Sequence, residues 1–388
     1  MREEQKKIVA VAEAGAKKNF EAQMALLQQF CAINCGTRNL EGNRKVVQLV
    51  DQVLHDMGAE VEHVEAKEFG MHIIARLKPE KPNGKVILNA HLDTAFFTDR
   101  VEDHPFRIEG EYAYGLGISD CKGGVVTILY GVKMMKEAGL LPDKEIVMIF
   151  NCDEEVGSPS SRPIFEREAA GAEAVLCFEP ARNKNGILTS RRGLACGKIV
   201  VNGIAAHAGL DGGTGASAVR ELANLIVRLT ERSDLSVGMN YNVAPISGGA
   251  NSSMVADHAE AEFCVPLDSI EIYERVKKDV LEELPQMGIV EGCSIETTLQ
   301  LMHHPMERNE ANVELFEKIH CAAELMGLAM PEESSFNCAD CNIWAGYHLP
   351  VIDGMGPYMY EIHTTNEHML IRTLPERTQL LGILLAML

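Results

Sequence analysis

The chain is poor in positive charge. Its 388 residues include 36 Lys and Arg against 56 Asp and Glu, which gives a formal net charge of −20. Because the phosphates of DNA and RNA are bound through a basic surface, this balance argues against a nucleic-acid partner. It does not predict a basic substrate, since surplus surface acids commonly serve solubility.

The chain also lacks long apolar runs, repeats, low-complexity tracts and Pro-rich linkers. The first 33 residues have the charged, amphipathic pattern of a helix without the apolar centre of a signal peptide, and no stretch reaches the length of a membrane span. We therefore expect a cytoplasmic protein with no membrane partner. Its eleven cysteines are odd in number and scattered, which favours reduced, buried thiols over a disulfide framework.

What is present is the composition of an ordinary globular protein, with 46% hydrophobic and 24% charged residues. A length of 388 residues suits two domains. Apolar runs at 85–90, 146–150 and 174–178 have the pattern of buried strands and alternate with amphipathic helices, for example at 125–138. This alternation predicts an α/β fold whose mixed, mostly parallel sheet is covered by helices on both faces.

The pattern changes near residue 190. Longer strands with alternating polar residues follow, with amphipathic helices at 216–232 and 269–287, in the order β-α-β-β-α-β. A string of this size forms a self-contained α+β open sandwich. We therefore predict a discontinuous catalytic domain, residues 1–190 and 303–388, and an inserted domain, residues 191–302.

Residues that bind metals recur at strand ends. Four lie just after a buried strand or at a Gly-rich turn, and a fifth lies shortly past an apolar run: His91, Asp120, Glu155, Glu179 and His363. Taken singly, such a residue is more often solvated or hydrogen-bonded. Together they suit two divalent ions with one bridging carboxylate, because the carboxyl ends of parallel strands meet at one edge of a sheet. Imidazole and carboxylate groups are ligands that zinc accepts.

Two further acids fit roles beside such ions. Glu154, adjacent to Glu155, is free to take a proton from a water molecule that the ions activate. Asp93 lies two residues after His91 on the same face of the strand. Its carboxylate is placed to accept a hydrogen bond from the second ring nitrogen of His91 and so to fix the tautomer.

Five segments occur in the order and at the separations of a known family: HLDT (91–94), GLGISDCKGG (115–124), NCDEEVGS (151–158), CFEP (177–180) and AAHAG (205–209). On these motifs the chain resembles the dinuclear zinc peptidases and amidohydrolases that include carboxypeptidase G, aminoacylase, succinyl-diaminopimelate desuccinylase and tripeptidase T. The resemblance covers nearly the whole chain. It includes the inserted domain, which in that family serves as a lid and dimerisation domain.

The resemblance implies a role for each metal-binding candidate. His91 and Glu179 would bind one metal ion, Glu155 and His363 would bind the other, and Asp120 would bridge the two. The ions implied are two zinc ions. Cobalt and manganese are alternatives, because they accept the same ligands.

The resemblance also implies three catalytic residues. Glu154 would act as general base and acid, and Asp93 would support a metal ligand. His207, in the lid domain, would reach across a homodimer joined through the lids and stabilise the oxyanion in the partner's active site. The site would be complete only when the lid closes.

Substrate preference follows from the same resemblance. Members with Glu at the position of Glu179 are mostly carboxypeptidases and deacylases, and the segments around Glu179 and Asn251 are most similar to the glutamate carboxypeptidase branch. Asn251 would bind the substrate near its carboxylate. Gly354 and Gly356 would line the same pocket with backbone amides.

The chain departs from the family pattern at two places. Pro266 stands where the family usually has an arginine that holds a substrate carboxylate, a task that Arg191 or Arg192 could take over. A Gly-Gly-x-x-Asp loop of the family reads NCADC at 337–341. Asp340 is kept and the glycines are not, so we expect a reshaped pocket floor.

These observations predict a zinc-dependent metallopeptidase or aminoacylase-type hydrolase that cleaves an amide bond next to a free carboxylate, in an N-acyl amino acid or a short peptide. A di- or tripeptidase of the aminopeptidase type is the alternative within the class. A non-catalytic, metal-binding dimer is the alternative from another class. The presence of every expected ligand and of Glu154 weighs against that last interpretation.

Overall fold

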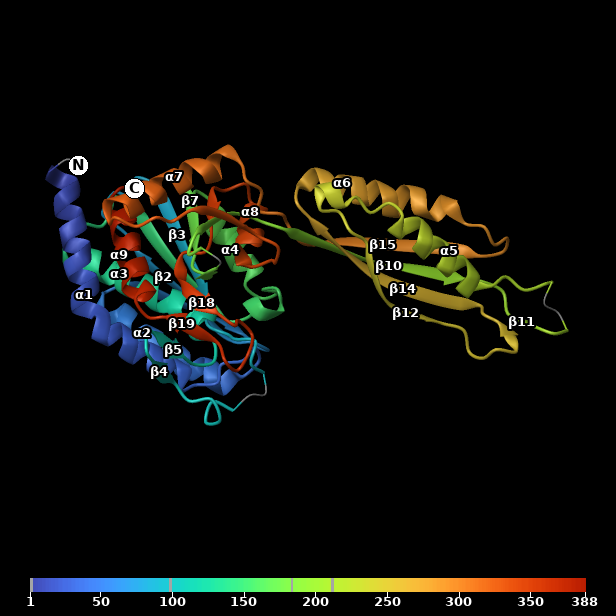
Figure 1. Ribbon diagram of the computed structural model, residues 1–388, viewed down its shortest axis with the longest axis horizontal. Helices are drawn as coiled ribbons and strands as arrows, with labels where there is room; N and C mark the ends of the chain where they lie inside the picture. The colour runs from blue at the N-terminus through green and yellow to red at the C-terminus, as the bar shows by residue number, and fades with distance from the viewer. Residues whose placement is uncertain (1–2, 98–99, 183, 211–212) are drawn as a thin grey trace. The chain divides into compact units, whose positions relative to one another are not determined.

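The computed structural model describes residues 3–97, 100–182, 184–210 and 213–388. By their internal contacts these residues fall into two units (Figure 1). Unit 1 comprises the chain up to Ser190, Arg308–Ser334 and Ala339–Leu388, and unit 2 comprises Arg191–Glu307 and Ser335–Cys338. Within the described ranges, every helix is too short or too polar to cross a membrane.

Unit 1 is built on a six-stranded sheet in the order β1-β2-β6-β3-β7-β17. The strands are β1 (Glu60–Ala66), β2 (Gly70–Leu77), β3 (Lys85–His91), β6 (Glu145–Asn151), β7 (Ala174–Cys177) and β17 (Val351–Ile352). β6, β3, β7 and β17 run parallel, and β1 and β2 extend the sheet in antiparallel fashion at one edge. β3 and β6 are buried beyond their first residues, because helices cover both faces of the sheet. The predicted α/β fold is confirmed.

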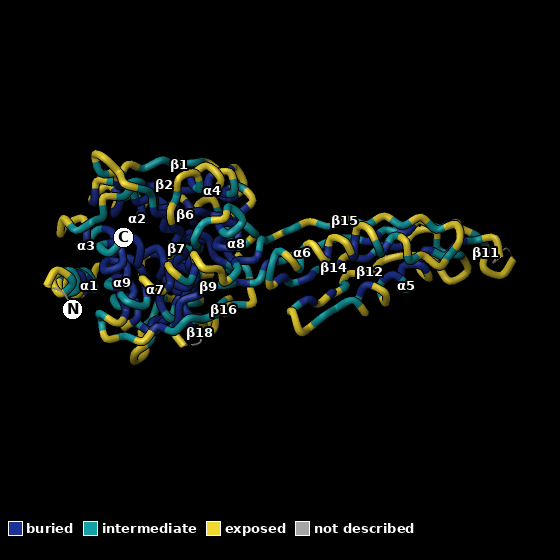
Figure 2. Tube along the Cα trace, turned by 90° about the horizontal axis from the view of Figure 1, so that it is seen from above, coloured by how far each residue is buried: buried dark blue, intermediate teal, exposed yellow. Residues whose placement is uncertain are grey.

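The helices of unit 1 are α1 (Glu3–Cys31), α2 (Leu40–Asp56), α3 (Gly124–Glu137), α4 (Arg162–Ala169), α7 (Glu310–Leu325), α8 (Asp340–Ala345) and α9 (Thr373–Leu385). Figure 1 shows α1, α3 and α9 together on one side of the sheet and α4 and α8 on the other. A Cβ at Gly131 of α3 would come 2.6 Å from Leu381 of α9, so glycine permits this close helix contact. The sheet and its helices form the buried interior of unit 1 (Figure 2).

A second sheet of unit 1 consists of very short strands in the order β4-β5-β19-β18-β8. They are β4 (Arg107–Glu109), β5 (Tyr112–Tyr114), β8 (Pro180–Ala181), β18 (Gly356–Tyr360) and β19 (His368–Leu370). The ring of His368 stacks on those of Tyr114 and Tyr360, with centroids 4.6 and 4.9 Å apart. Because β18 and β19 pair on either side of the loop 361–367, this stack fixes the base of that loop. Separately, β9 (Ile187–Arg191) pairs with β16 (Glu332–Ser335).

Unit 2 is an antiparallel sheet in the order β12-β14-β10-β15 with helices on one face. Its main elements are β10 (Gly193–Asn202), α5 (Ala218–Thr230), β12 (Asn242–Gly248), β14 (His258–Leu267), α6 (Ile270–Lys277) and β15 (Ser294–His303), in the order β-α-β-β-α-β. Alternate residues of β10, such as Ile199 and Val201, are buried against the helices. A separate pair is formed by β11 (Ala206–His207) and β13 (Met254–Val255).

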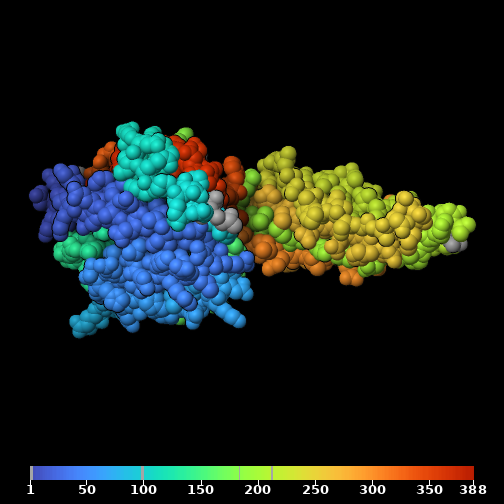
Figure 3. All heavy atoms as spheres, turned by 90° about the horizontal axis from the view of Figure 1, so that it is seen from below, coloured from blue at the N-terminus to red at the C-terminus, as the bar shows by residue number. Residues whose placement is uncertain are grey.

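In the space-filling view of Figure 3, the N-terminal part of the chain, in blue, forms most of the visible surface of unit 1.

Cys196 and Cys264 form a disulfide bond in unit 2. They are 68 residues apart in sequence, but the antiparallel register of β10 and β14 places them directly opposite one another, with 4.1 Å between their Cα atoms. The expectation that the cysteines are reduced thiols is therefore wrong for this pair. The other nine cysteines are free thiols.

Candidate metal centre

The candidate metal ligands come from the carboxyl ends of neighbouring parallel strands. His91 is the last residue of β3 and lies in register with Asn151, the last residue of β6. Glu154 and Glu155 follow β6 in a short 3₁₀ helix, η2 (Glu154–Val156), and Glu179 lies two residues beyond β7. Because the three strands are adjacent and parallel, their ends bring these side chains to one edge of the sheet.

Two ligand groups share one aspartate. In the first group, His91 Nε2 lies 2.9 Å from Asp120 Oδ1 and 3.4 Å from Glu179 Oε1. In the second group, His363 Nε2 lies 3.3 Å from Asp120 Oδ2 and 3.4 Å from Glu155 Oε2. Within each group the ligand atoms lie within 4.8 Å of one another. Asp120 therefore offers one oxygen to each group, which is the arrangement of a bridging carboxylate.

The charges of this centre fit divalent cations. The side chains of Asp120, Glu155 and Glu179 are only 6, 7 and 8% exposed. Glu155 Oε1 is buried, and none of the described residues offers it a hydrogen bond. Buried carboxylates need a positive partner, and two histidines do not balance three acids. Imidazole nitrogens with carboxylate oxygens form a donor set that zinc, cobalt and manganese accept.

Protons and cations compete at this centre. Burial and the neighbouring Asp120 raise the pKa of Glu155 to about 8. The hydrogen bond to Asp120 raises the pKa of His363 to about 9. Burial would raise the pKa of Asp120, but hydrogen bonds from His363 and His91 hold it below its usual range. Burial also raises the pKa of Glu179, with repulsion from Asp120 as a second cause. Metal binding to this centre would therefore release protons.

Asp93 connects the ligands to the turn that follows β6. Its carboxylate accepts hydrogen bonds from Thr37 Oγ1 at 2.7 Å and from the backbone N–H groups of Glu154 and Glu155, each at 3.2 Å. His91 Nδ1 lies 2.9 Å from the backbone oxygen of Asp93 and 3.3 Å from its carboxylate. Since a carbonyl oxygen can only accept, Nδ1 carries the proton and Nε2 faces the ligand group. The backbone carbonyl is thus the nearer partner of the ring, rather than the expected carboxylate. The contact of Thr37 had no sequence signal.

Two other side chains lie beside the ligand groups. Glu154 belongs to neither group among the described residues. Burial raises its pKa well above the ordinary value, and nearby acids, Glu179 first, add to the shift. A carboxyl of raised pKa is a stronger base than an exposed glutamate, which suits a group that accepts and returns a proton. Cys121 Sγ is close to the first group but donates to the backbone oxygen of Phe178 at 3.0 Å.

His207 and Asn251 are exposed residues of unit 2. Nδ1 of His207 accepts hydrogen bonds from the backbone N–H groups of Gly209 and Leu210, at 3.2 and 3.1 Å. Because a backbone N–H can only donate, Nε2 carries the ring proton of the neutral side chain. His207 therefore presents a hydrogen-bond donor on the surface of unit 2. Asn251 Oδ1 accepts a hydrogen bond from the backbone N–H of Ser253 at 3.0 Å.

The two glycines expected to offer backbone amides to a substrate already use them. The N–H of Gly354 donates to the Asp353 carboxylate at 2.6 Å, and the N–H of Gly356 donates to the backbone oxygen of Glu179 at 2.9 Å. A Cβ at Gly356 would lie 2.6 Å from the backbone oxygen of Phe178. Glycine at 356 permits close packing of two backbone segments, and the expectation that Gly354 and Gly356 line a substrate pocket stays a prediction.

Both candidates to replace the family arginine have partners within unit 2. Arg191 donates to the backbone and side-chain oxygens of Asn337, at 3.3 and 3.0 Å. Arg192 pairs with Asp268 and lies over the ring of Phe336, 4.5 Å from its centroid. The two arginines thus contact the segment 335–338, which includes the start of the altered family loop.

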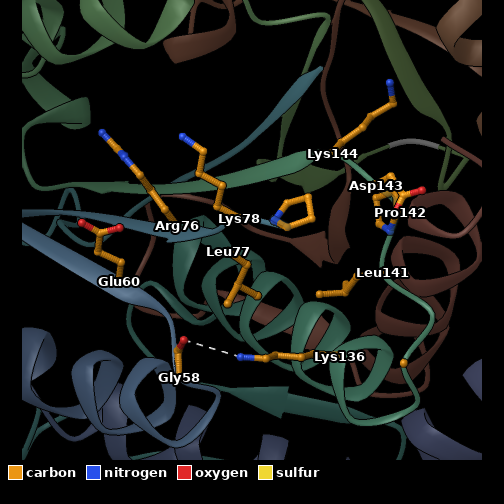
Figure 4. Close-up of a pocket in the computed structure, with 12 residues that line it drawn as sticks. Gly58, Glu60, Arg76, Leu77, Lys78, Lys136, Leu141, Pro142, Asp143 and Lys144 are labelled. Atoms are coloured by element: carbon orange, nitrogen blue, oxygen red, sulfur yellow. Dashed lines mark hydrogen bonds between the residues drawn. The ribbon is translucent and has the colours of Figure 1, made fainter. Parts of the chain in front are cut away.

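A pocket of about 480 Å³ lies at the opposite end of the sheet, where β6 begins. Figure 4 shows its four basic side chains, Arg76, Lys78, Lys136 and Lys144. Three of them have acceptors already. Arg76 Nη2 lies 2.6 Å from Glu168 Oε1, and Lys144 Nζ lies 2.6 Å from Glu173 Oε2. Lys136 Nζ donates to the backbone oxygens of Met57 and Gly58. The pocket lies at the amino ends of the strands whose carboxyl ends carry the candidate metal ligands.

Solved structures share this fold. Aminopeptidase PepT from Bacillus cereus has a TM-score of 0.79 at 20% sequence identity, covering 95% of this chain and 98% of that one. A dinuclear metal binding peptidase of the M20 family from Bacillus subtilis has a TM-score of 0.73 at 14% identity, covering 96% and 98%. At these identities the likeness concerns the fold alone.

Sequence comparison extends the likeness to named relatives. Carboxypeptidase G2 from Pseudomonas sp. (strain RS-16) is 28% identical over 362 residues, which cover 92% of this chain and 86% of that protein. Acetylornithine deacetylase from Aliivibrio fischeri is 24% identical over 261 residues, which cover 63% of this chain and 67% of that protein. The family model described as Peptidase family M20/M25/M40 matches residues 87–386. This match spans well over half of the chain and agrees with the family that the motifs indicated, so the chain belongs to Peptidase family M20/M25/M40.

Proposed function

We propose that the protein is a metal-dependent hydrolase that cleaves an amide bond next to a free carboxylate, as a carboxypeptidase or an N-acyl-amino-acid deacylase. The observation that carries the proposal is the shared carboxylate: Asp120 directs one oxygen to His91 and the other to His363. Two groups joined in this way suit two neighbouring ions that promote attack on a carbonyl. The similarity to carboxypeptidase G2 over 92% of the chain favours this branch of the family.

Each ligand has a defined task in this proposal. His91 and Glu179 hold one ion, Glu155 and His363 hold the other, and Asp120 holds both. When bound, the two ions supply Lewis-acid activation of a water molecule and of the substrate carbonyl. We expect zinc, with cobalt or manganese as substitutes, because the nitrogen and oxygen donors accept all three.

Glu154 moves the proton. It takes a proton from the attacking water and passes it to the leaving amine, a role that suits a buried carboxyl with a raised pKa. Asp93 supports this step by holding the backbone N–H of Glu154 and, through its carbonyl oxygen, the ring of His91. The chain's own residues therefore supply both the proton carrier and its placement.

Residues of unit 2 act on the substrate in this proposal. His207 offers its Nε2–H to the oxygen that becomes negative during attack, in the active site of the partner in a homodimer. Asn251 binds the substrate near its carboxylate. The edge strand β12 supports a dimer formed through unit 2: in the described chain it pairs with β14 on one side, and its Ile246 is 58% exposed. An open, partly apolar strand edge is a surface on which a second sheet can pair.

The substrate we propose is an N-acyl amino acid or a short peptide, and the location we propose is the cytoplasm. Nine free thiols fit a reducing compartment, whereas the disulfide Cys196–Cys264 does not. The alternative within the family is a di- or tripeptidase that requires a free amine; an aminopeptidase and a tripeptidase are named among the solved structures of this fold.

A hydrolysis panel tests the proposal. The protein is reconstituted with zinc or cobalt and given N-acyl amino acids, α- and γ-linked glutamyl peptides and free tripeptides, each with and without a chelator. Chelator-sensitive cleavage of the blocked substrates supports the proposal. Cleavage of free tripeptides alone supports the peptidase alternative. No cleavage by protein that holds two ions points first to a substrate outside the panel and second to a non-catalytic, metal-binding role.

Glu154→Gln separates proton transfer from metal binding. We expect turnover to fall by about 10²- to 10⁴-fold with both ions retained, because an amide cannot accept the proton. Glu166→Gln, at an exposed acid of α4, is the matched control and should turn over at the wild-type rate. Near-normal turnover of E154Q would remove Glu154 from its assigned role.

A further inference from the structure

Glu367 is a buried acid that the proposed mechanism does not use. It lies four residues after His363, at the end of the loop 361–367, and is only 1% exposed. Its Oε1 accepts hydrogen bonds from the backbone N–H groups of Ser119 at 2.9 Å and Asp120 at 3.2 Å. The Glu367 carboxylate therefore holds the backbone of the residue whose side chain joins the two ligand groups.

The segment that carries Asp120 needs such a partner. It lies in the turn η1 (Ile118–Gly123), where Asp120 has φ −108° and ψ 93°, a conformation that interrupts regular helical hydrogen bonding. Buried backbone N–H groups outside a regular element need acceptors from elsewhere. Glu367 supplies them twice, because its own backbone oxygen also accepts from the N–H of Gly115 at 3.3 Å. One residue thus holds the stretch 115–120 at both of its ends.

The second carboxylate oxygen of Glu367 makes no comparable contact. Oε2 is buried, and in the part of the chain that the structure describes it has no hydrogen-bond partner. The charges around it act in opposite directions, since Asp120 repels a negative charge on Glu367 and Lys122 attracts it. The side chain therefore contributes one oxygen atom, Oε1, which its length places where it can accept hydrogen bonds from two N–H groups.

We propose that Glu367 is a positioning residue that sets the direction in which Asp120 presents its two oxygens. The loop 361–367 then supplies both a ligand, His363, and the support of the bridging carboxylate. This inference rests on the proposed two-ion function of the centre. It predicts that displacing the Glu367 carboxylate weakens the binding of both ions, because both depend on Asp120.

Two substitutions of Glu367 separate the effect of side-chain length from the effect of the carboxylate charge. E367Q keeps the length of the side chain and one acceptor oxygen, and removes the charge. E367D keeps the acid and withdraws its oxygens by one methylene group. We expect E367D to lower the affinity for both ions by about 10- to 100-fold, the loss typical when the support of a metal ligand is removed, and E367Q to stay near wild type. The reverse order would overturn the positioning role in favour of charge.

The readouts exclude a merely structural role. Affinity is measured by competition with a chromophoric chelator, and ligand geometry by the d–d absorption of the cobalt-substituted protein. If E367D only lowers the unfolding midpoint and keeps wild-type affinities and cobalt spectrum, the proposal is overturned. Glu361→Asp is the matched control, because it makes the same change in the same loop at an exposed residue whose carboxylate accepts from Asn366 at 2.8 Å. We expect E361D to bind the ion held by His91 as wild type does.

Failure of this inference and failure of the proposed function give different results. If the wild-type protein does not bind two ions, both fail, whatever the variants do. If it binds two ions and hydrolyses the panel substrates while E367D matches it in affinity and cobalt spectrum, only the role of Glu367 fails.

Discussion

Replacing Asp93 by Ala should destabilise unit 1 and weaken metal binding together. The carboxylate, 2% exposed, accepts one hydroxyl and two backbone hydrogen bonds, from Thr37, Glu154 and Glu155. Each buried donor left without an acceptor costs about 1–3 kcal/mol, so three donors bound the effect at roughly 3–9 kcal/mol. Water that enters the vacated space would satisfy part of this loss, and we expect unit 1 to lose about 3–5 kcal/mol of its free energy of unfolding.

The lone tryptophan allows this loss to be measured in unit 1 by itself. Trp344 is fully buried in α8, packs on Phe165 with 4.6 Å between ring centroids, and donates to Asn89 at 2.9 Å. Its fluorescence in a urea titration of the metal-free protein follows the unfolding of unit 1. In a parallel metal titration, affinity should fall by about 10- to 100-fold, because the Asp93 carboxylate holds the backbone N–H of Glu155 and lies 3.3 Å from His91 Nδ1.

Two variants that remove fewer of these hydrogen bonds should lower the free energy of unfolding by less than Asp93→Ala does. Thr37→Val removes one donor and leaves the Asp93 carboxylate with two, so it should cost about 1 kcal/mol. Asp93→Asn turns an amide NH₂ toward a donor that it cannot satisfy and should lie between T37V and D93A. If D93A loses less than about 1 kcal/mol and binds metal as wild type does, the carboxylate does not hold the centre together and the reasoning is refuted.

Three further outcomes are expected. In the metal-free protein, burial raises the pKa values of Glu155 and Glu367 from 4.5 to about 8. Each folded pKa lies above the unfolded one. Ionisation of these groups therefore leaves the free energy of unfolding unchanged below about pH 4.5 and lowers it increasingly between pH 4.5 and pH 8. Stability followed by Trp344 fluorescence should therefore fall over this window, less steeply in E367Q, and a rise would contradict the assigned cause. His363→Ala should leave one ion per chain by elemental analysis, since the second ligand group loses its nitrogen donor; two retained ions would exclude His363 as a ligand. Reduction of Cys196–Cys264, whose sequence separation is 68, should destabilise unit 2 by about 4 kcal/mol. Circular dichroism would detect this change, and the Trp344 transition should stay in place; a shift of that transition would show that the bond also supports unit 1.

The sequence predicts well those candidate ligands that lie at the carboxyl edge of the parallel sheet. Buried apolar runs identify β3, β6 and β7; His91 is the last residue of β3, and Glu155 and Glu179 follow β6 and β7 within four residues. They share one edge because parallel strands end together. Periodicity alone does not bring Asp120 and His363 to the same place; they became candidates because Asp120 follows a Gly-rich turn and His363 lies shortly past an apolar run.

Contacts made by loops had no comparable signal. Thr37 lies 56 residues from Asp93, and Glu367 lies 248 residues from Ser119. Hydrogen bonds of this range depend on the tertiary fold and leave no periodic pattern in the sequence. Strands as short as β19, with three residues, show no alternation either. The Cys196–Cys264 bond depends on the register of β10 and β14, which a slip of one residue would destroy.

The order of the ligands along the chain determines when the centre can form during synthesis. His91, Asp120, Glu155 and Glu179 leave the ribosome before the long insertion of unit 2, whereas His363 follows it. A nascent chain, or one broken off within the insertion, contains the first ligand group and lacks the nitrogen donor of the second. Under the proposed two-ion function, fragments released before residue 363 would lack one complete ligand group and would be inactive.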